Sequence, residues 1–288
     1  MTFNDNARIN PHKVSRRGRN TGIAVGGGGT LHVIGLFIVS QFLGVDLTGL
    51  AGGGSTGGEQ TQDQALSECT TAEAANSSID CRIAGAADSL DTYWATQVDG
   101  YRTTNVVLFT DQTNTGCGGA TSASGPFYCP PDETIYVDTA FYDDLRTRFG
   151  STGGPLAEMY VIAHEWGHHI QNSTGIMDGL DRQATGPTSD SVRLELQADC
   201  FAGAWVGAAS TITDDDGVVF LDPVTDAQIA DALSAASAVG DDRIQESAQG
   251  QVTPETWTHG SSDKRQQWFT TGLNGGPNSC NLFEVATP

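Results

Sequence analysis

The sequence predicts an α+β domain that is mainly helical with a small sheet. Several long stretches have the spacing of amphipathic helices, and only two short stretches have the composition of strands. Hydrophobic residues make up 38% of the 288-residue chain, which is enough for a packed core. The 36 glycines and the low charged fraction of 17% also indicate long loops.

Apolar spacing predicts the helices. In residues 189–210, for example, Leu194, Ala198 and Phe201 recur at intervals of four and three. Pro155 can open a helix as its first residue, because its fixed backbone angle suits that position. The same reasoning gives the full set of predicted helices: residues 74–94, 155–172, 189–210, 226–239 and 263–273.

Two short stretches predict strands. Residues 105–110 (NVVLFT) and 133–137 (ETIYV) are rich in β-branched and aromatic side chains. Between them, residues 115–131 are rich in Gly, Ser and Pro and predict a loop. With few strands and many helices, the pattern favours a helical domain that carries one small sheet.

The amino-terminal region predicts a membrane segment. Residues 1–20 carry five Lys or Arg side chains and one Asp, whereas residues 22–45 carry no charge. This order is typical of a single-pass anchor whose amino terminus is cytoplasmic, and a cleaved signal peptide has the same order. We expect residues 1–21 to form a basic cytoplasmic tail, 22–45 a transmembrane anchor (or signal segment) and 46–65 a flexible linker. Residues after this linker then form an extracytoplasmic domain, 66–288, which would be secreted if the segment is cleaved.

Charge excludes one class of partner. The chain has a formal net charge of −21, and nearly all of its acidic residues follow the basic tail. A domain this acidic repels phosphate backbones, so we expect no nucleic-acid partner.

The six cysteines predict disulfide bonds. All of them follow the apolar segment, in the part of the chain expected in an oxidising compartment. The sequence has no Cys-x-x-Cys pair, which excludes a cysteine zinc ribbon or a thioredoxin-type redox motif. Local spacing favours Cys69 with Cys81 and Cys117 with Cys129, which would leave Cys200 with Cys280. Buried free thiols are the alternative.

The strongest chemical signal is His164-Glu165-Trp166-Gly167-His168, a His-Glu-x-x-His pattern inside a predicted helix. Residues four apart lie on one helical face, so both imidazoles can reach one metal ion. Glu165 lies about 100° round the helix, where it can meet a water on that metal. His169 lies on a different face, and we expect it to have a structural or surface role.

A catalytic zinc site usually has three protein ligands. A third histidine six residues after His168 is absent, because that position is Thr174 and the preceding glycine is replaced by Gln171, which excludes the metzincin arrangement. Downstream, Glu195 and Asp199 lie four apart on one face of the next helix. We expect Glu195 to be the third ligand and Asp199 to hold a ligand imidazole through its other nitrogen.

A further group should stabilise the oxyanion of a tetrahedral intermediate. His259 is the remaining histidine of the predicted domain and stands just ahead of a short helix, so we predict that it donates to the oxyanion. A surface histidine is the alternative. Arg265 could pair with an acidic neighbour near the site.

Together these segments resemble the neutral zinc metallopeptidases of the YpfJ-like family. The resemblance rests on four blocks that occur in order: GPFYCPPDETIYVD (125–138), HEWGHHIQ (164–171), RLELQADCFAG (193–203) and HGSSDKR (259–265). The order of the motifs is more distantly similar to that of HtpX-type membrane peptidases. The resemblance implies a zincin fold, one Zn²⁺ per chain held by His164, His168 and Glu195, and Glu165 as the catalytic acid and base.

We therefore predict a membrane-anchored, extracytoplasmic zinc metalloendopeptidase with a peptide or protein substrate. The substrate is expected to lie extended and to pair with the strand at residues 133–137. A non-catalytic binding or scaffold protein that retains zinc for stability is the alternative. The sequence does not predict the oligomeric state.

Overall fold

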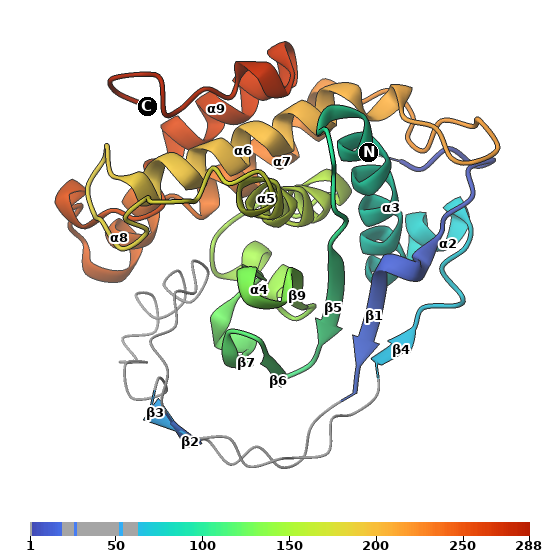
Figure 1. The fold of residues 1–288 in the computed structure, drawn as a ribbon, viewed down its shortest axis with the longest axis horizontal. Coiled ribbons are helices and arrows are strands. Elements are labelled where there is room, and N and C mark those ends of the chain that lie inside the picture. The colour runs from blue at the N-terminus through green and yellow to red at the C-terminus, as the bar shows by residue number, and fades with distance from the viewer. Residues whose placement is uncertain (1, 19–25, 28–51, 54–62) are drawn as a thin grey trace.

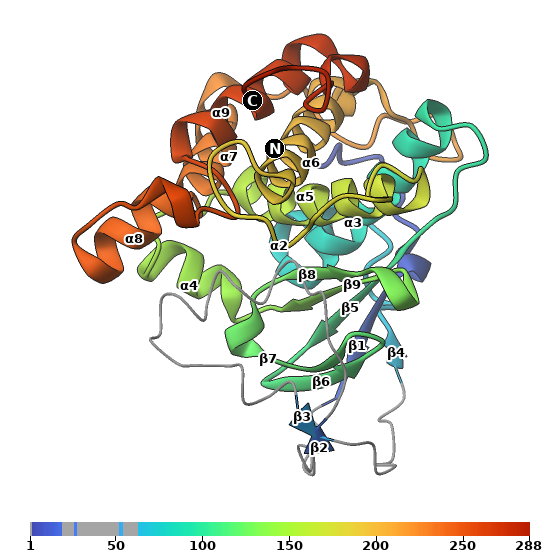
Figure 2. The same cartoon turned by 60° about the vertical axis from the view of Figure 1, so that its left-hand side comes forward.

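The computed structural model describes residues 2–18, 26–27, 52–53 and 63–288. In this part of the chain, helices are packed over one face of a five-stranded sheet, and a short hairpin lies against the other face (Figure 2). The predicted α+β class is confirmed.

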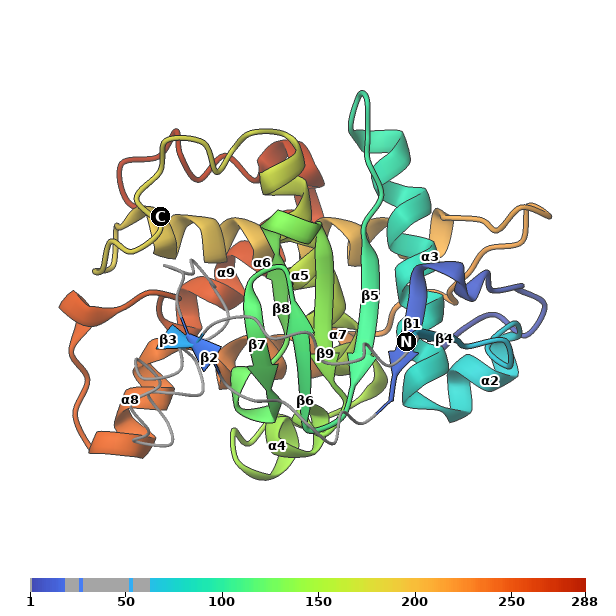
Figure 3. The same ribbon diagram turned by 60° about the horizontal axis from the view of Figure 1, so that its bottom comes forward.

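The central sheet has the strand order β4-β1-β5-β9-β8. Strands β1, β5 and β9 run parallel, and the two outer strands β4 and β8 are antiparallel to their neighbours (Figure 3). The strands are β1 Val14–Arg17, β4 Asp63–Ala65, β5 Asn105–Phe109, β8 Phe127–Cys129 and β9 Thr134–Asp138. Two separate ribbons pair β2 Gly26–Gly27 with β3 Gly52–Gly53, and β6 Gln112–Thr115 with β7 Gly118–Thr121.

Alternating side chains of the sheet divide the apolar core in two. Val106 and Leu108 of β5 face the helices and join the main core, whereas Val107 and Phe109 face the β6–β7 hairpin. The Cys117–Cys129 disulfide lies in this smaller cluster and joins the hairpin to β8. The hairpin thus covers the sheet face that the helices leave open.

The helices form layers above the sheet (Figure 1). Helix α5 contacts β8 and β9 on one side and α6 on the other, and α6 packs in turn on α9. Every residue of α5 from Leu156 to Gln171 is buried, as expected for a helix covered on all sides. The α-helices are α2 Ala72–Ser77, α3 Ile79–Gln97, α4 Phe141–Thr147, α5 Pro155–Ser173, α6 Asp190–Ala208, α7 Asp226–Ala238, α8 Asp241–Gln249 and α9 Ser262–Gly275. Short 3-10 turns occupy Pro11–Lys13, Ser122–Ser124, Pro130–Asp132, Ala209–Thr211, Pro254–Thr256 and Pro277–Ser279.

Glycines allow α6 and α9 to approach closely. A Cβ added at Gly203 would lie 2.0 Å from the carbonyl oxygen of Phe269, and one added at Gly272 would lie 1.8 Å from that of Cys200. Both distances are far inside van der Waals contact, so only glycine fits. The Cys200–Cys280 disulfide fastens the segment after α9 to α6 at the same level.

All five predicted helices are present, with two corrections to the predicted elements. Residues 74–94 form two helices, because Ser78 has an extended backbone (φ −120°, ψ 137°) that ends α2 before α3 begins. Residues 115–131, predicted as a loop, contain β7 and the edge strand β8. Both are too short, at four and three residues, to give a recognisable pattern.

The prediction of residues 1–21 as a separate tail is wrong for residues 2–18. Strand β1 lies inside the sheet between β4 and β5, and Phe3 is buried in the main core. Arg16 pairs with Asp80 at 2.5 Å and Arg17 with Asp63 at 2.7 Å. The basic residues that predicted a cytoplasmic tail therefore neutralise acidic residues of the domain.

The pairing of β1 with β4 also corrects the predicted topology. These strands flank residues 19–62 and are hydrogen-bonded, so both ends of this segment lie on the same side of any membrane. A single crossing, with residues 1–21 on one side and residues 66–288 on the other, is incompatible with that pairing. Residues 63–65, predicted as the end of the linker, form β4.

The predicted anchor, residues 22–45, falls outside the described residues apart from Gly26 and Gly27, as does most of the predicted linker. In the part of the chain that the structure describes, no helix is both long enough and apolar enough to cross a bilayer. Membrane attachment through residues 22–45 stays a prediction.

Candidate metal centre

Helix α5 carries the His-Glu-x-x-His pattern into the centre of the domain. His164 and His168 are buried, one turn apart, with their ring centroids separated by 4.8 Å. Pro155 is the first residue of α5, as predicted. The two imidazoles therefore project from a helix whose position is fixed by the surrounding core.

Helix α6 brings a carboxylate to the same point. Glu195 Oε2 lies 3.2 Å from His164 Nε2, and Glu195 Oε1 lies 3.4 Å from His168 Nε2. The two helices approach closely at Gly167, where an added Cβ would lie 2.9 Å from the Cα of Ala198. The glycine inside the motif thus lets Glu195 reach both histidines.

These three residues have the properties of a metal site. One ligand atom from each lies within 4.8 Å of the other two, and all three side chains are buried. Glu195 Oε1 is also buried and accepts no hydrogen bond from any residue that the structure describes. A buried carboxylate oxygen without a donor is costly unless a cation binds it, and two imidazoles with one carboxylate are a donor set that Zn²⁺ prefers. The predicted ligands are therefore brought together in a site that could hold a metal ion.

The other nitrogen of each imidazole is occupied. His164 Nδ1 lies 2.8 Å from Asp199 Oδ1, and His168 Nδ1 lies 2.9 Å from Gln171 Oε1. When Nδ1 carries the donated proton, Nε2 presents its lone pair to a metal. The structure thus places Asp199 as predicted. Gln171 was considered only as a departure from the metzincin pattern, so its role was missed.

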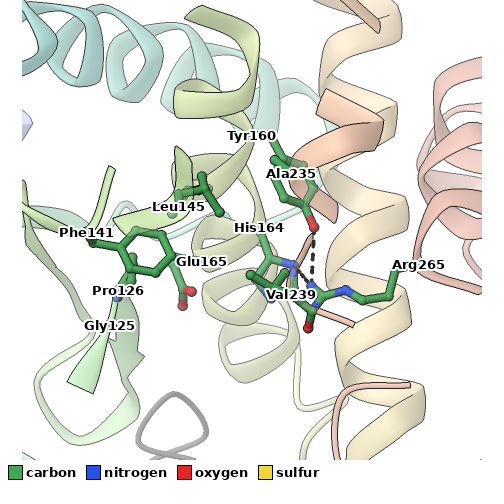
Figure 4. Close-up of a pocket in the computed structure, with 11 residues that line it drawn as sticks. Gly125, Pro126, Phe141, Leu145, Tyr160, His164, Glu165, Ala235, Val239 and Arg265 are labelled. Atoms are coloured by element: carbon green, nitrogen blue, oxygen red, sulfur yellow. Dashed lines mark hydrogen bonds between the residues drawn. The ribbon is translucent and has the colours of Figure 1, made fainter. Parts of the chain in front are cut away.

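Asp199 belongs to a buried charged cluster. Arg265 donates from Nε to Asp199 Oδ2 at 2.8 Å and from Nη2 to Oδ1 at 3.0 Å, and Tyr160 also donates to Oδ1. Figure 4 shows Arg265 extended toward Tyr160 and His164. Burial alone would raise the pKa of Asp199, but the charges of Arg265 and His164 lower it. The proposed acidic partner of Arg265 is therefore Asp199.

Glu165 lies beside the three candidate ligands. Its side chain is buried, and the backbone N–H of Tyr128 in β8 lies close enough to lower its pKa. Burial raises the pKa of Glu165, and the nearby charges of His168 and His164 oppose this shift. A carboxylate with a raised pKa is better suited to accept and return a proton near neutral pH.

His259 approaches the site from the loop before α9. It is buried, and its Nδ1 lies 3.2 Å from Asp241 Oδ1 and 2.9 Å from Thr258 Oγ1. Burial would lower the pKa of His259, but the charges of Asp241 and Glu195 raise it. Asp241 Oδ2 also accepts from the backbone N–H groups of His259 and Gly260, so it fixes the whole loop. Asp241 was missed because it stands eighteen residues before its partner, outside every motif.

His169 does not join the metal cluster. Its Nε2 lies 2.6 Å from the carbonyl oxygen of Arg102, and its Nδ1 lies 3.1 Å from the hydroxyl of Tyr128. Asn172 donates to the same hydroxyl at 3.0 Å. His169 and Asn172 thus fasten β8, whose backbone contacts Glu165, to α5. This agrees with the expected structural role of His169.

Two further predictions have opposite outcomes. The three cysteine pairs are the predicted ones: Cys69–Cys81 and Cys117–Cys129, which local spacing favours, and Cys200–Cys280, which these two pairs leave. The expected pairing of a substrate with residues 133–137 is wrong, because β9 is already hydrogen-bonded to β5 on one side and to β8 on the other.

Comparisons with known proteins agree with the motif. A family profile described as "Putative neutral zinc metallopeptidase" matches residues 4–283. An uncharacterised protein of Mycobacterium tuberculosis (strain H37Rv) is 50% identical over 223 residues, covering 77% of this chain and 76% of the relative. The uncharacterised protein YpfJ of Escherichia coli K12 is 39% identical over 268 residues, covering 90% of this chain and 87% of the relative. No solved structure matches the chain significantly.

Proposed function

The chain belongs to the family described as "putative neutral zinc metallopeptidase", and from this premise we propose that it is a zinc-dependent endopeptidase with a zincin-like catalytic domain. One observation carries the proposal. Two imidazoles and a carboxylate converge on one point, and a second carboxylate, Glu165, lies beside them without being needed as a ligand.

His164, His168 and Glu195 would hold the zinc. Bound there, zinc would polarise the scissile carbonyl and lower the pKa of a water molecule. Glu165 takes the proton of the attacking water and passes it to the leaving amine. His259, held by Asp241, donates a hydrogen bond to the oxyanion.

An extended peptide would bind along β8 rather than along β9. Strand β8 is one of the two edge strands of the described sheet, and its outer side, unlike either side of β9, pairs with no other described strand. Because Tyr128 of β8 contacts Glu165, a peptide on this edge would lie beside the proposed general base. Pairing of a peptide with β8 would use backbone groups, which suits substrates of varied sequence.

We further propose that the domain works outside the cytoplasm. Its three disulfides support this location, because such bonds persist in oxidising compartments. The partner we propose is a peptide or an unfolded segment of a protein, and no nucleic acid.

The test is the variant Glu165→Gln, which keeps the shape of the side chain and removes the base. We expect its zinc content and melting temperature to stay close to those of wild type. Cleavage of a diverse peptide library should fall by at least about a hundredfold, the usual scale for loss of general acid–base catalysis. The measurements are metal analysis, thermal unfolding and mass spectrometry of the digested library.

Two variants serve as comparisons. Glu195→Gln should lower zinc content and activity together, because it removes a charged ligand. His259→Ala should retain zinc and lose about a hundredfold in turnover. Wild type with full zinc occupancy that cleaves no peptide would contradict the proposal and favour a zinc-stabilised binding or scaffold protein.

A further inference from the structure

A pocket with about 460 Å³ of empty space, part of which is open solvent, lies beside His164 and Glu165 (Figure 4). We propose that this pocket selects an apolar side chain of the substrate residue next to the scissile bond. The inference rests on the proposed function, because it assumes that a peptide carbonyl lies between Glu165 and the three candidate ligands. It adds the class of residue at which the protein would cut.

The walls of the pocket are apolar and come from separate elements. Helix α4 contributes Phe141 and Leu145, α5 contributes Val161, and α7 contributes Ala235, with Val239 directly after its last residue. Val161 stands one turn before His164 on the same helix, so this wall continues directly into the metal centre. A side chain that enters here would remove apolar surface from water on both partners.

Arg265, the one Lys or Arg among the described residues that line the pocket, is not available to a substrate. Arg265 uses Nε and Nη2 for Asp199, Nη2 also for Tyr160, and Nη1 for the carbonyl oxygen of Val239. These bonds occupy at least four of the five N–H donors of the guanidinium. Arg265 therefore does not make the pocket a site for Asp or Glu.

Acidic and basic substrate residues are both disfavoured in this pocket, for different reasons. An acidic side chain would meet the carboxylate of Glu165 at the pocket without a free cation to offset it. A basic side chain could approach Glu165, but its charge would lie among the apolar groups of α4 and α7, where charge is poorly solvated. An apolar side chain meets neither difficulty, so Leu, Met and Phe are the residues that the pocket fits.

The walls offer two substitutions with opposite effects. Leu145→Ala enlarges the pocket, and we expect preference to move from Leu and Met toward Phe and Trp. Ala235→Leu fills it, and preference should move toward Ala and Gly. One methylene more or less in an apolar pocket alters kcat/KM about 10- to 200-fold, and each substitution changes three side-chain carbons. Leu66→Ala is the matched control, because Leu66 is equally buried in the main core but does not line the pocket.

The primary measurement is the residue flanking each cut in a digested peptide library. Wild type should show apolar residues on one side of the scissile bond, Leu145→Ala and Ala235→Leu should shift their size in opposite directions, and Leu66→Ala should leave the preference unchanged. Cleavage without an apolar preference, or a preference that neither pocket variant changes, would overturn the pocket while leaving the peptidase proposal intact.

A second measurement does not need catalysis. Tripeptide amides that differ only in a central Leu, Glu or Lys are titrated into zinc-loaded wild type, Leu145→Ala and Ala235→Leu by calorimetry. Tighter binding of the Leu peptide, lost in Ala235→Leu, would support the pocket even if no library peptide were cut, and only the peptidase proposal would then fail. Equal binding of the three peptides to all proteins would overturn the pocket.

Discussion

The two ligand histidines occupy equivalent positions one turn apart on α5, yet their surroundings differ in charge. His164 Nδ1 meets the carboxylate of Asp199, which is paired with the guanidinium of Arg265. His168 Nδ1 meets the neutral amide of Gln171. Both arrangements orient an imidazole, but one requires the burial of two charges and the other of none.

The neutral side is a chain of amides. Gln171 Nε2 donates to the carbonyl oxygen of Leu194 at 2.7 Å and to Gln197 Oε1 at 3.1 Å. Gln197 Nε2 then donates to the carbonyl oxygen of Cys280 at 2.8 Å. The side-chain oxygen and nitrogen of both glutamines each have an uncharged hydrogen-bond partner, so the loss of one member leaves a limited desolvation cost.

The charged side connects more of the fold. Asp199 on α6, Arg265 on α9 and Tyr160 on α5 meet in one buried cluster, so this side holds three helices around His164. The orientation of a ligand imidazole is thus tied to the stability of the fold at His164 and is nearly separate from it at His168. We therefore expect substitutions on the two sides to have unequal effects on stability.

The largest effect is expected from Arg265→Met, which leaves Asp199 as an unpaired buried charge. Breaking a buried ion pair on one side costs about 3–5 kcal/mol. The melting temperature should fall by roughly 10 °C for a domain of this size. Arg8→Met is the control, because Arg8 is 81% exposed in its pair with Asp216 and should change stability by less than about 1 kcal/mol.

The double variant Asp199→Leu/Arg265→Met separates stability from orientation. Apolar replacements for a buried ion pair are often neutral or stabilising, so the melting temperature should recover relative to Arg265→Met alone. Zinc affinity should stay low, because His164 has lost its partner. Recovery of both properties would mean that Asp199 serves only the fold.

A smaller effect is expected from Gln171→Leu on the neutral side. Loss of a group that orients a metal ligand typically lowers metal affinity 10- to 100-fold. Stability should fall less than in Arg265→Met, since no charge is left unpaired. Competition with a zinc chelator and thermal unfolding measure the two quantities. Gln249→Leu, at an exposed position on α8, is the control. If Gln171→Leu lost as much stability as Arg265→Met, the two sides would not differ as proposed.

The sequence predicts the charged side better than the neutral one. Glu195 and Asp199 stand out because carboxylates four apart on an apolar helix need an explanation, and the 3.6-residue period places both histidines on one face. A glutamine such as Gln171 gives no comparable signal, since its amide is common on any helix. Asp241 and Tyr160 act across the fold from distant positions, which local patterns do not encode.

The amino-terminal strand shows the same limit. Residues 14–17 carry two arginines and one valine, and nothing in this stretch indicates that it pairs with β5, which lies some ninety residues later. Charge alone favoured a tail, whereas the matching acidic residues, Asp63 and Asp80, become partners only after folding. Long helices and two of the three cysteine pairs were predictable because their signals are local, and the Cys200–Cys280 pair followed because no other cysteines were left.

The smallest effect that distinguishes the two sides is a dependence of zinc binding on pH. In the metal-free protein, burial would lower the pKa of His164, but the carboxylates of Asp199 and Glu195 raise it to about 10. Since this pKa lies above the unfolded value of about 6.5, the protonated imidazole stabilises the metal-free fold fully below pH 6.5 and loses this contribution as pH rises through 10.

Zinc must displace that proton, because a ligand imidazole is neutral. We expect His164 to contribute one released proton per zinc at pH 8, and zinc affinity to rise by about tenfold per pH unit on its account. Asp199→Asn removes the charge that raises the pKa of His164, so proton release at pH 8 should fall, whereas Gln171→Leu should weaken binding and leave the release unchanged. Calorimetry in two buffers of different protonation enthalpy gives the number of protons. Equal release by wild type and Asp199→Asn would show that the charge of Asp199 does not set the protonation of His164, and the two sides would then differ in stability alone.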